Sequence, residues 1–552
     1  MGDRLVARAV LYIVAAVYLL TFTGLPDVPD SEVEFQTTSS LFRTGEFGLS
    51  GTPEADLIVA SEFNVRRGVG GAFYSWGGVG QAAAALPLYA VGRAMAYLWP
   101  EIERRHSEDL FHGASRSEYF SHLLVGLRNP ALGALTAWLL VLTLRRMNCG
   151  RKSSLIAGLS YGLGTFAWSQ ARSTLSDVQA TFFLFAAFHL LVKVREEYEG
   201  LKSPRRRDLV LCGLALGMAL LTRVATAPAI AVLVTVAVGV TIRGRRWLGR
   251  GRADWTSVAR DLWWIGTPAL ACFGAFLIFN RARFGSPLDM GYRGSFIGGL
   301  FGEYSMAWAL GGLFISPGKG LLWLAPGVLL LPLGWRRARA LGEHLWRWTL
   351  PGIALAVILP VSSSTSWTGA YCFGPRYLLP LLPFLWLGVG LGLDRLHGVG
   401  LSRRLAMGAV AFGLVTNLPS ALVDHVTHQN LALDAAREAW PGMDANKRNE
   451  DVMLLMKVHW DWNLAAPWAH WRIFRHRMAG LGETFSSADI YYLSPDVELR
   501  PPNQREESFY HWALFDLRHR LGGAIWPAIG AALMLLGAGT VCSIRGLDPT
   551  LR

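Results

Sequence analysis

Three carboxylates stand close together near the start of the chain. Asp30, Glu32 and Glu34 fall within five residues, directly after a first long apolar run. An acid held beside buried protein at a membrane surface can act as a general base with a shifted pKa. The simpler interpretation is a helix start, in which Asp30 or Ser31 is the N-cap and Glu34 completes a capping box.

A second acid and several arginines occupy the ends of later apolar runs. Asp177 stands in a short turn between two such runs, and an acid beside hydrocarbon is costly enough to suggest a function. The alternative is an N-cap for the following helix. Arg223, and Arg281 with Arg283 beyond it, end two further runs. They could pair with an anionic ligand or a lipid headgroup, or be snorkelling side chains.

Two further segments carry side chains suited to a phosphorylated sugar. Lys319 stands in Ser-Pro-Gly-Lys-Gly, which lacks the spacing of a nucleotide-binding P-loop. It could contact a phosphate as a point charge or simply anchor the surface. Trp367, Arg376 and Tyr377 lie within eleven residues. Such aromatics and an arginine could stack on a sugar and grip a phosphate, or form an interfacial aromatic belt.

Metal and redox chemistry have little support in the sequence. The five cysteines form no CxxC pair and no zinc-type spacing. His425 and His428 have ligand-like spacing, but no partner is evident, so they are interpreted as surface histidines. We expect no dedicated metal site and no certain cofactor, although Asp30 and Asp177 could share a divalent cation.

The elements that must position these residues are membrane helices. The 552 residues are 52% hydrophobic and only 17% charged, below the roughly 25% of soluble domains. Apolar runs of about 20 residues recur along the chain. We expect twelve spans: one over 5–24, and others that start near His122, Ser154, Val178, Leu209, Ala225, Leu262, Leu321, Trp348, Tyr377, Leu405 and Leu521.

Basic clusters set the expected orientation. The net charge of +13 comes from short Lys/Arg groups that follow the even-numbered spans, such as Arg145–Arg146 and Arg245–Arg246. This pattern is typical of cytoplasmic loops and excludes a nucleic-acid-binding face. Both termini are then expected in the cytoplasm. The apolar stretch 79–99 is expected to lie on or re-enter from the outer surface, because counting it as a span would move every later cluster outside.

The expected fold is an all-α polytopic membrane protein with about twelve transmembrane helices. Residues 1–423 would form the core, with outer-face juxtamembrane helices in a long first outer loop over 25–121. Residues 424–520 would form a small extracytoplasmic segment, and 521–552 the last helix with a cytoplasmic tail. The acids and cations named above would then gather on the outer side.

Five stretches in this order resemble the GT-C superfamily of membrane glycosyltransferases, in particular the branch of protein O-mannosyltransferases and the lipid A aminoarabinose transferase. They are PDSEVEFQTTSSLFRTGEFGL, YSWGGVGQAAAALPLYAVG, NRARFGSPLDMGY, LFISPGKGLLWLAP and WTGAYCFGPRYLLPLLPF. The resemblance implies an inner-membrane enzyme of the GT-C fold. Such an enzyme moves a hexosyl or pentosyl group from a polyprenyl-phosphate donor to a glycan, lipid or protein acceptor on the outer face.

The resemblance also implies roles for individual residues. Asp30 would be the general base, with Glu32 as the near alternative, because many relatives have adjacent acids where this chain has Asp-Ser-Glu. Asp177 would be the second acid. The implied substrate-binding residues, for the donor phosphate and the sugar, are Arg223, Arg281, Asp289, Tyr292, Lys319, Trp367, Arg376 and Tyr377.

Two other functions are compatible with many membrane spans. The chain could be a transporter or flippase for a lipid or small solute, although its halves show no evident repeat and its charges gather at the outer ends rather than inside the spans. It could also be an assembly partner that keeps the fold without the chemistry. An assay of sugar transfer separates these alternatives.

Overall fold

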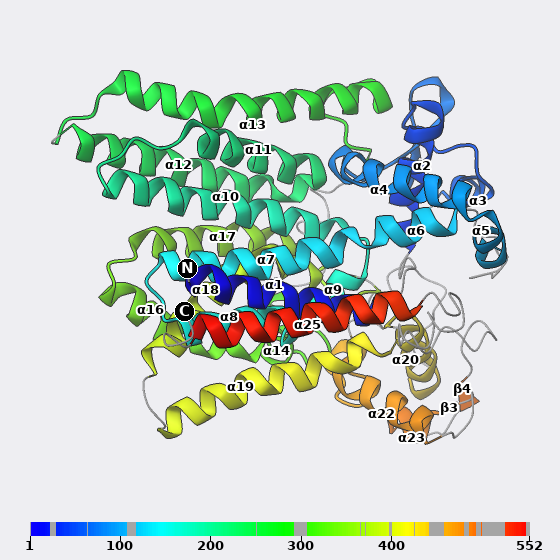
Figure 1. Ribbon diagram of the computed structural model, residues 1–552. Helices are drawn as coiled ribbons and strands as arrows, with labels where there is room; N and C mark the ends of the chain where they lie inside the picture. The colour runs from blue at the N-terminus through cyan, green and yellow to red at the C-terminus, as the bar shows by residue number, and fades with distance from the viewer. Residues whose placement is uncertain are drawn as a thin grey trace.

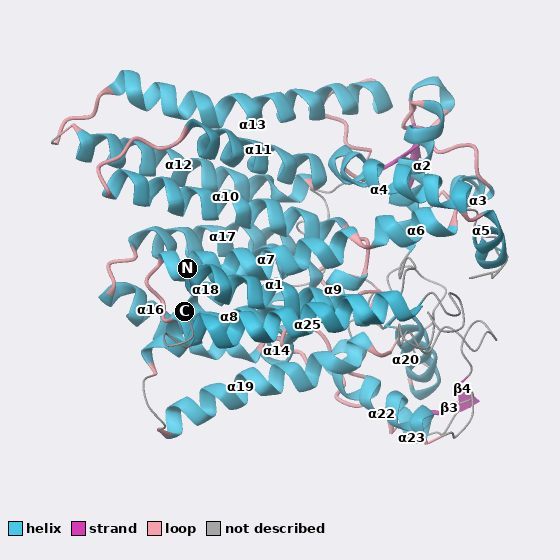
Figure 2. Cartoon of the chain, viewed as in Figure 1, coloured by secondary structure: helices cyan, strands magenta, loops and turns pink. Residues whose placement is uncertain are grey.

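The computed structural model describes most of the chain. The described residues are 2–22, 29–62, 64–107, 118–249, 251–291, 306–364, 366–369, 371–396, 400–423, 425–440, 457–479, 485–492, 498–499 and 525–547. They are overwhelmingly helical, with two short two-stranded sheets (Figure 2). The expectation of an all-α polytopic membrane protein is confirmed.

Long helices run side by side to form the bundle (Figure 1). They are α1 (Gly2–Leu20), α7 (Arg128–Arg146), α8 (Arg151–Leu163), α10 (Ser176–Glu199), α11 (Arg206–Thr222), α12 (Ala227–Leu248), α13 (Trp255–Phe284), α17 (His344–Ser362), α18 (Leu382–Arg395), α19 (Leu401–Asn417) and α25 (Ile525–Leu547). Among the described residues, seven helical stretches are long and apolar enough to cross a membrane. The count of twelve spans stays a prediction.

One expected span is broken into three pieces. It consists of α15 (Leu321–Leu324), the 3-10 helix η4 (Pro326–Leu330) and α16 (Leu331–Ala340). Pro326 lacks the backbone N–H that a continuous α-helix requires, so the helix is interrupted where that residue stands. The short apolar helix α14 (Met306–Ile315) precedes this broken element.

The loop over 25–121, which the sequence predicts on the outer side, contributes a cap of short elements at one end of the bundle (Figure 1). They are α2 (Pro29–Thr44), α3 (Pro53–Ser61), β1 (Val65–Arg67), η1 (Val69–Gly71), β2 (Phe73–Ser75), α4 (Val79–Leu98), α5 (Pro100–Ser107) and α6 (Tyr119–Gly126). The two strands pair antiparallel, with Arg66 opposite Tyr74. The first turn of α4 packs closely on α11. A Cβ added at Gly80 would stand only 2.8 Å from the backbone of Thr222.

Shorter elements join the spans at the same end. They are α9 (Ala167–Arg172), η2 (Val224–Thr226), η5 (Arg376–Leu381) and η6 (Leu418–Ala421), followed by the outer segment of α20 (His425–Ala439), α22 (Ala466–Met478), β3 (Phe485–Ser486), α23 (Ser487–Tyr491) and β4 (Glu498–Leu499). This segment has its own small core, in which Leu431, Ile473 and Tyr491 are fully buried. Residues 500–520 lie outside the described part.

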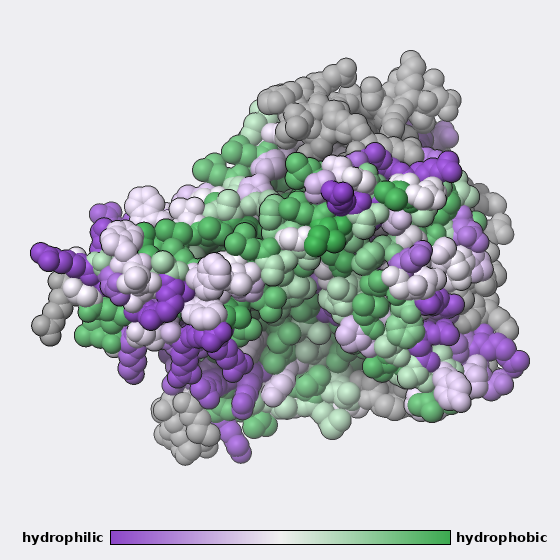
Figure 3. All heavy atoms as spheres, turned by 90° about the horizontal axis from the view of Figure 1, so that it is seen from above, coloured by the Kyte–Doolittle hydropathy of each residue, from purple (hydrophilic) through white to green (hydrophobic). Residues whose placement is uncertain are grey.

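Both termini lie at the opposite end of the bundle (Figure 1). Large apolar side chains along α13, including Trp263, Leu270 and Ile278, are more than 60% exposed, as expected of a helix that faces lipid. Figure 3 shows this wide apolar zone between polar ends. The bundle therefore has two polar faces, one with the termini and one with the cap and the outer segment.

Candidate functional site

The first acid of α2 meets the arginine that begins η5. Asp30 Oδ2 lies 3.4 Å from Arg376 Nη1, and Asn64 Nδ2 donates to Asp30 Oδ1 at 2.5 Å. Pro29 begins the helix, which puts Asp30 in its first turn, where the helix dipole favours an acid. The Asp30 side chain remains about one-third exposed. It can therefore still reach a small molecule at this face.

A second acid is buried a short way along the same face. Asp177 begins α10, is only 1% exposed, and its Oδ2 accepts from Arg223 Nη1 at 3.1 Å. The other carboxylate oxygen of Asp177 is buried and has no hydrogen-bond partner among the described residues. Arg223 also stands over the ring of Tyr377, 5.1 Å from its centroid. This acid–arginine pair therefore borders the η5 segment as well.

Arg376 joins the two acids. Its Nη2 donates to the Tyr377 hydroxyl at 3.1 Å, and its Nη1 contacts Cys372 Sγ at 3.4 Å. Both Asp30 and Asp177 lie close enough to stabilise its positive charge. Its buried Nε has no hydrogen-bond partner within the described chain. Gly369 approaches the Arg376 side chain so closely that a Cβ there would stand 2.8 Å from it.

Lys319 enters the cluster from the loop between α14 and α15. Its side chain is fully buried, and Nζ donates to the carbonyl of Cys372. Its backbone N–H donates to Ser316 Oγ at 3.2 Å, which fixes the loop. Burial lowers the pKa of Lys319 to about 7, and the nearby Arg376 acts in the same direction. Lys319 is thus poised to change charge near neutral pH.

The other two acids of α2 point in different directions, as residues two apart on a helix must. Glu32 lies 3.1 Å from His122 Nε2 and accepts from Gln36 Nε2 at 2.7 Å. Glu34 packs against Gly77 and lies within electrostatic range of Arg128 and Arg283. Burial raises the pKa of Glu34 to about 7, although the two arginines oppose that shift. We did not single out Glu34 as an acid of the site from the sequence.

Arg281 and Arg283 of α13 have opposite surroundings. Arg281, the sequence candidate, is exposed, whereas Arg283 is 2% exposed. Arg283 donates to the carbonyl oxygens of Ser75 and Gly77, the latter at 3.2 Å, and so ties α13 to the cap. Arg128 of α7 similarly donates to the carbonyl of Thr174 at 2.9 Å. The sequence suggests a ligand for Arg283 only jointly with Arg281, and it does not single out Arg128.

The remaining candidates lie at the edges of this cluster. Asp289 accepts from Arg66 Nη1 at 2.8 Å, which fastens the segment after α13 to β1. Trp367 is 1% exposed and packs on Gly312 of α14. Tyr292 lies outside the described residues. Asp30, Asp177, Arg223, Lys319, Arg376 and Tyr377 therefore form the shared centre, named here, after the side on which it is expected, the outer charge cluster.

The interpretation of His425 and His428 as surface histidines is wrong. His428 is 2% exposed, His425 is half-buried, and fully buried His470 of α22 lies beside both. No sequence pattern links His470 to the other two, because 42 residues separate it from His428. In the described chain this trio is the one group of three or more His, Cys, Asp or Glu side chains whose ligand atoms lie together.

One protein-family model matches part of the chain. The family model described as dolichyl-phosphate-mannose-protein mannosyltransferase matches residues 114–278, which run from before α6 into α13 and include Asp177 and Arg223. A comparison with curated protein sequences finds no match. The match confirms the expected resemblance to GT-C membrane glycosyltransferases, and with it the interpretation of the chain as a glycosyltransferase.

Solved structures of two kinds are similar over most of the chain. The first is ArnT from Cupriavidus metallidurans. Its undecaprenyl-phosphate-bound form is 15% identical over 98% of this chain and 76% of that one, with a TM-score of 0.39, and its apo form gives 0.43. The second is the oligosaccharyltransferase of Archaeoglobus fulgidus. It is 12% identical over 81% of this chain and 59% of its own length, with a TM-score of 0.39.

Proposed function

We propose that this protein transfers a sugar from a polyprenyl-phosphate donor to an acceptor on the outer face of the membrane. The observation that carries the proposal is the outer charge cluster, in which two acids and three cations from five separate segments meet around Tyr377. Buried charges of this density are costly and are kept where function needs them. The family match, whose description names a polyprenyl-phosphate-linked sugar, supports the same reaction.

The cations of the cluster would bind the donor phosphate. As the bond between the anomeric carbon and the phosphate oxygen breaks, negative charge develops on the departing lipid phosphate. Arg376 has a buried Nε with no partner among the described residues, and Lys319 and Arg223 flank it. Fixed cations in a site that excludes water stabilise such charge far better than solvated ones. They would lower the barrier to bond cleavage.

An acid of the cluster would take the proton of the acceptor. The acceptor hydroxyl or amine attacks the anomeric carbon, its proton passes to a carboxylate, and the polyprenyl phosphate leaves from the opposite side, so the configuration inverts. Asp30 is the preferred base because it is partly exposed and lies within the cluster. Glu32, the near alternative, is engaged by His122 and Gln36. Asp177 would hold Arg223 in place.

The surrounding elements would complete the substrate site. Tyr377 at the centre offers a ring face to a sugar, and Trp367 and Tyr292 are the other aromatic candidates. The lipid tail would lie among the apolar side chains at the outer end of the bundle. Residues 1–423 would form the catalytic core with the 25–121 loop, and 424–520 an outer segment. The basic clusters at the end that carries the termini favour the cytoplasm of an inner membrane for that end.

The test is transfer of label from a panel of polyprenyl-phosphate sugars by the purified full-length protein. We expect Asp30→Asn to lower turnover by about 10²- to 10⁴-fold, the usual contribution of a general base. Glu101→Gln, an exposed acid of the same outer loop, is the matched control and should retain full turnover. Equal turnover in Asp30→Asn and wild type would move the base to Glu32 or Glu34. No transfer with any donor, in protein shown to be folded, would refute the proposed reaction.

A further inference from the structure

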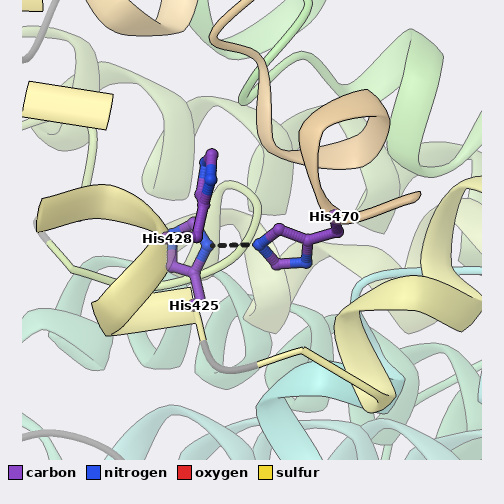
Figure 4. A group of neighbouring side chains, drawn as sticks. All are labelled: His425, His428 and His470. Atoms are coloured by element: carbon purple, nitrogen blue, oxygen red, sulfur yellow. Dashed lines mark hydrogen bonds between the residues drawn. The ribbon is translucent and has the colours of Figure 1, made fainter. Parts of the chain in front are cut away.

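Three imidazole rings meet in the outer segment, outside the outer charge cluster (Figure 4). His425 and His428 stand one helical turn apart at the start of α20, and His470 comes from the first turns of α22. One ligand nitrogen of each ring lies within 4.8 Å of the others. The two separate helices α20 and α22 thus bring three ligand nitrogens close together.

The spacing of the nitrogens suits a tetrahedral ion. His425 Nδ1 and His470 Nε2 are 3.4 Å apart. Two nitrogens bound to one tetrahedral metal at about 2.0–2.1 Å are separated by about 3.3–3.4 Å. The distance between these two nitrogens therefore suits a single bridging ion. His428 needs only a small adjustment to reach the same ion, because its ligand atom is within 4.8 Å of both.

The third ring is held by a contact of its own. The Tyr491 hydroxyl lies 3.2 Å from His428 Nδ1, which leaves Nε2 as the nitrogen available for a ligand. Metal-binding histidines usually have such a partner on the second nitrogen, because it fixes the tautomer and the ring orientation. His470 and Tyr491 are fully buried, so the environment is rigid.

The protonation state of the rings is also suitable. Burial lowers the pKa of all three imidazoles, to about 3 for His470 and well below the ordinary value for His425 and His428. Lys319 and the neighbouring rings act in the same direction on His425 and His428, and Arg172 does so on His470. Neutral imidazole is the form that binds metal, and no ring has to lose a proton first.

We propose that His425, His428 and His470 form a binding site for one divalent transition-metal ion of the zinc class. Imidazole nitrogens suit Zn²⁺ and its neighbours rather than Mg²⁺ or Ca²⁺, which require oxygen ligands. Three protein ligands leave a fourth position for water or another small ligand.

The ion would join the outer segment to the loop that carries the outer charge cluster. The ring of Phe373 lies 5.7 Å from His425 and 5.5 Å from His470, centroid to centroid. Phe373 immediately follows Cys372, whose carbonyl accepts from Lys319. A metal that fixes α20 against α22 would therefore also fix one wall of the loop over residues 371–376. This role is structural and holds whether or not the proposed reaction is correct.

The experiment measures metal in the full-length protein, purified in detergent with an affinity tag that contains no histidine. Elemental analysis gives the number of ions per chain, and Co²⁺ added after chelation reports geometry through its visible absorption. The variants are His428→Gln and His470→Gln, which keep most of the side-chain volume. His476→Gln, on the same helix as His470 but outside the trio, is the matched control.

We expect about one ion per chain and a tetrahedral Co²⁺ spectrum in wild type and in His476→Gln. The two trio variants should bind Co²⁺ at least about 100-fold more weakly, since even indirect contacts to a ligand histidine change affinity by about 10- to 100-fold. Equal binding in all four proteins, or none in wild type, would overturn the proposal. Should the trio variants fail to fold, Zn²⁺ must raise the unfolding temperature of chelated wild type, and no rise would also overturn it.

Discussion

Buried charged side chains are paired differently at the two polar ends of the bundle. At the end with the termini, buried acids have arginine partners. Asp394 accepts from Arg337 Nε at 3.0 Å and from the Gly150 N–H at 2.7 Å. Glu343 receives both Nη atoms of Arg195, at 2.7 and 3.1 Å. Both oxygens of each of these acids are thus engaged within the protein, and the pairs join neighbouring helices.

At the opposite end, the pairs are incomplete. Asp177 has one buried oxygen, and Arg376 one buried nitrogen, with no hydrogen-bond partner within the described residues. Lys319 is buried and donates to the Cys372 carbonyl. A buried polar group without a partner is destabilising, so such groups are expected where a ligand completes the set. Under the proposed function, the charges at this end bind a substrate, whereas those at the other end hold the bundle together.

The largest expected effect is on stability and concerns a complete pair. Asp261 accepts from Arg245 Nε at 2.6 Å and from the Tyr198 hydroxyl at 2.6 Å, and both ionic groups are buried. Asp261→Asn would leave Arg245 as a buried charge without a counter-ion, which costs about 3–5 kcal/mol. Thermal unfolding in detergent measures this loss, while turnover per folded molecule should stay unchanged. A stable variant with reduced turnover would contradict the division between the two ends.

For an incomplete pair we expect the reverse, a loss of activity with little loss of stability. Arg376→Gln removes the proposed phosphate ligand, and we expect kcat/KM for the donor to fall by about 10²- to 10³-fold, as when one preorganised donor is lost elsewhere. Arg376→Lys should recover part of the activity because it restores the charge but not the planar geometry. Arg404→Gln, exposed on α19, is the control. Steady-state kinetics with a labelled donor would decide, and a drop in stability alone would count against the assignment.

Glu34 should make stability depend on pH near the outer end. Its folded-state pKa of about 7 lies above the ordinary value of 4.5, so the folded protein retains the proton longer than the unfolded chain. Stability should therefore fall as pH rises from about 4.5 to about 7, and stay level above that range. Glu34→Gln should remove this fall. Unfolding temperatures of the two proteins at pH 5 and pH 8 test it, and parallel curves would show that Glu34 keeps an ordinary pKa.

The smallest effect is expected for an exposed pair. Arg104 and Glu101 of α5 are joined at 2.7 Å, yet their side chains are 70% and 80% exposed. Such pairs contribute about 0–1 kcal/mol, and added salt screens them. Glu101→Gln should change the unfolding free energy by less than that amount. A larger loss would mean that α5 has a role in the cap beyond its surface charge.

Much of the architecture could be predicted because lipid imposes a simple rule. Apolar runs and basic clusters have to alternate in a multi-spanning protein, and each expected span coincides with helical structure. Asp30, Asp177 and Arg376 could be selected for a related reason: a charged side chain beside hydrocarbon is costly, so each needs an explanation.

The failures have a different physical origin. Arg281 and Arg283 are two positions apart on a helix and face nearly opposite sides, so choosing between them requires the helix rotation. Glu34 gains its significance from Gly77 and Arg283, which are distant in sequence. His470 joins His425 and His428 only through the packing of α22 on α20. In each of these cases the surroundings of the side chain depend on packing between distant segments, which cannot be read from a single sequence.

The burial of Lys319 would make the proposed phosphate site a proton acceptor as well. With a pKa of about 7, the amine is only partly charged near neutral pH while it faces the Cys372 carbonyl. A phosphate brought beside it would favour the ammonium form, so donor binding would draw a proton from solution. The donor would then bind more weakly as pH rises above 7. Without the donor, the neutral amine would avoid the full desolvation cost of a buried cation. The positive charge would form when the donor phosphate binds.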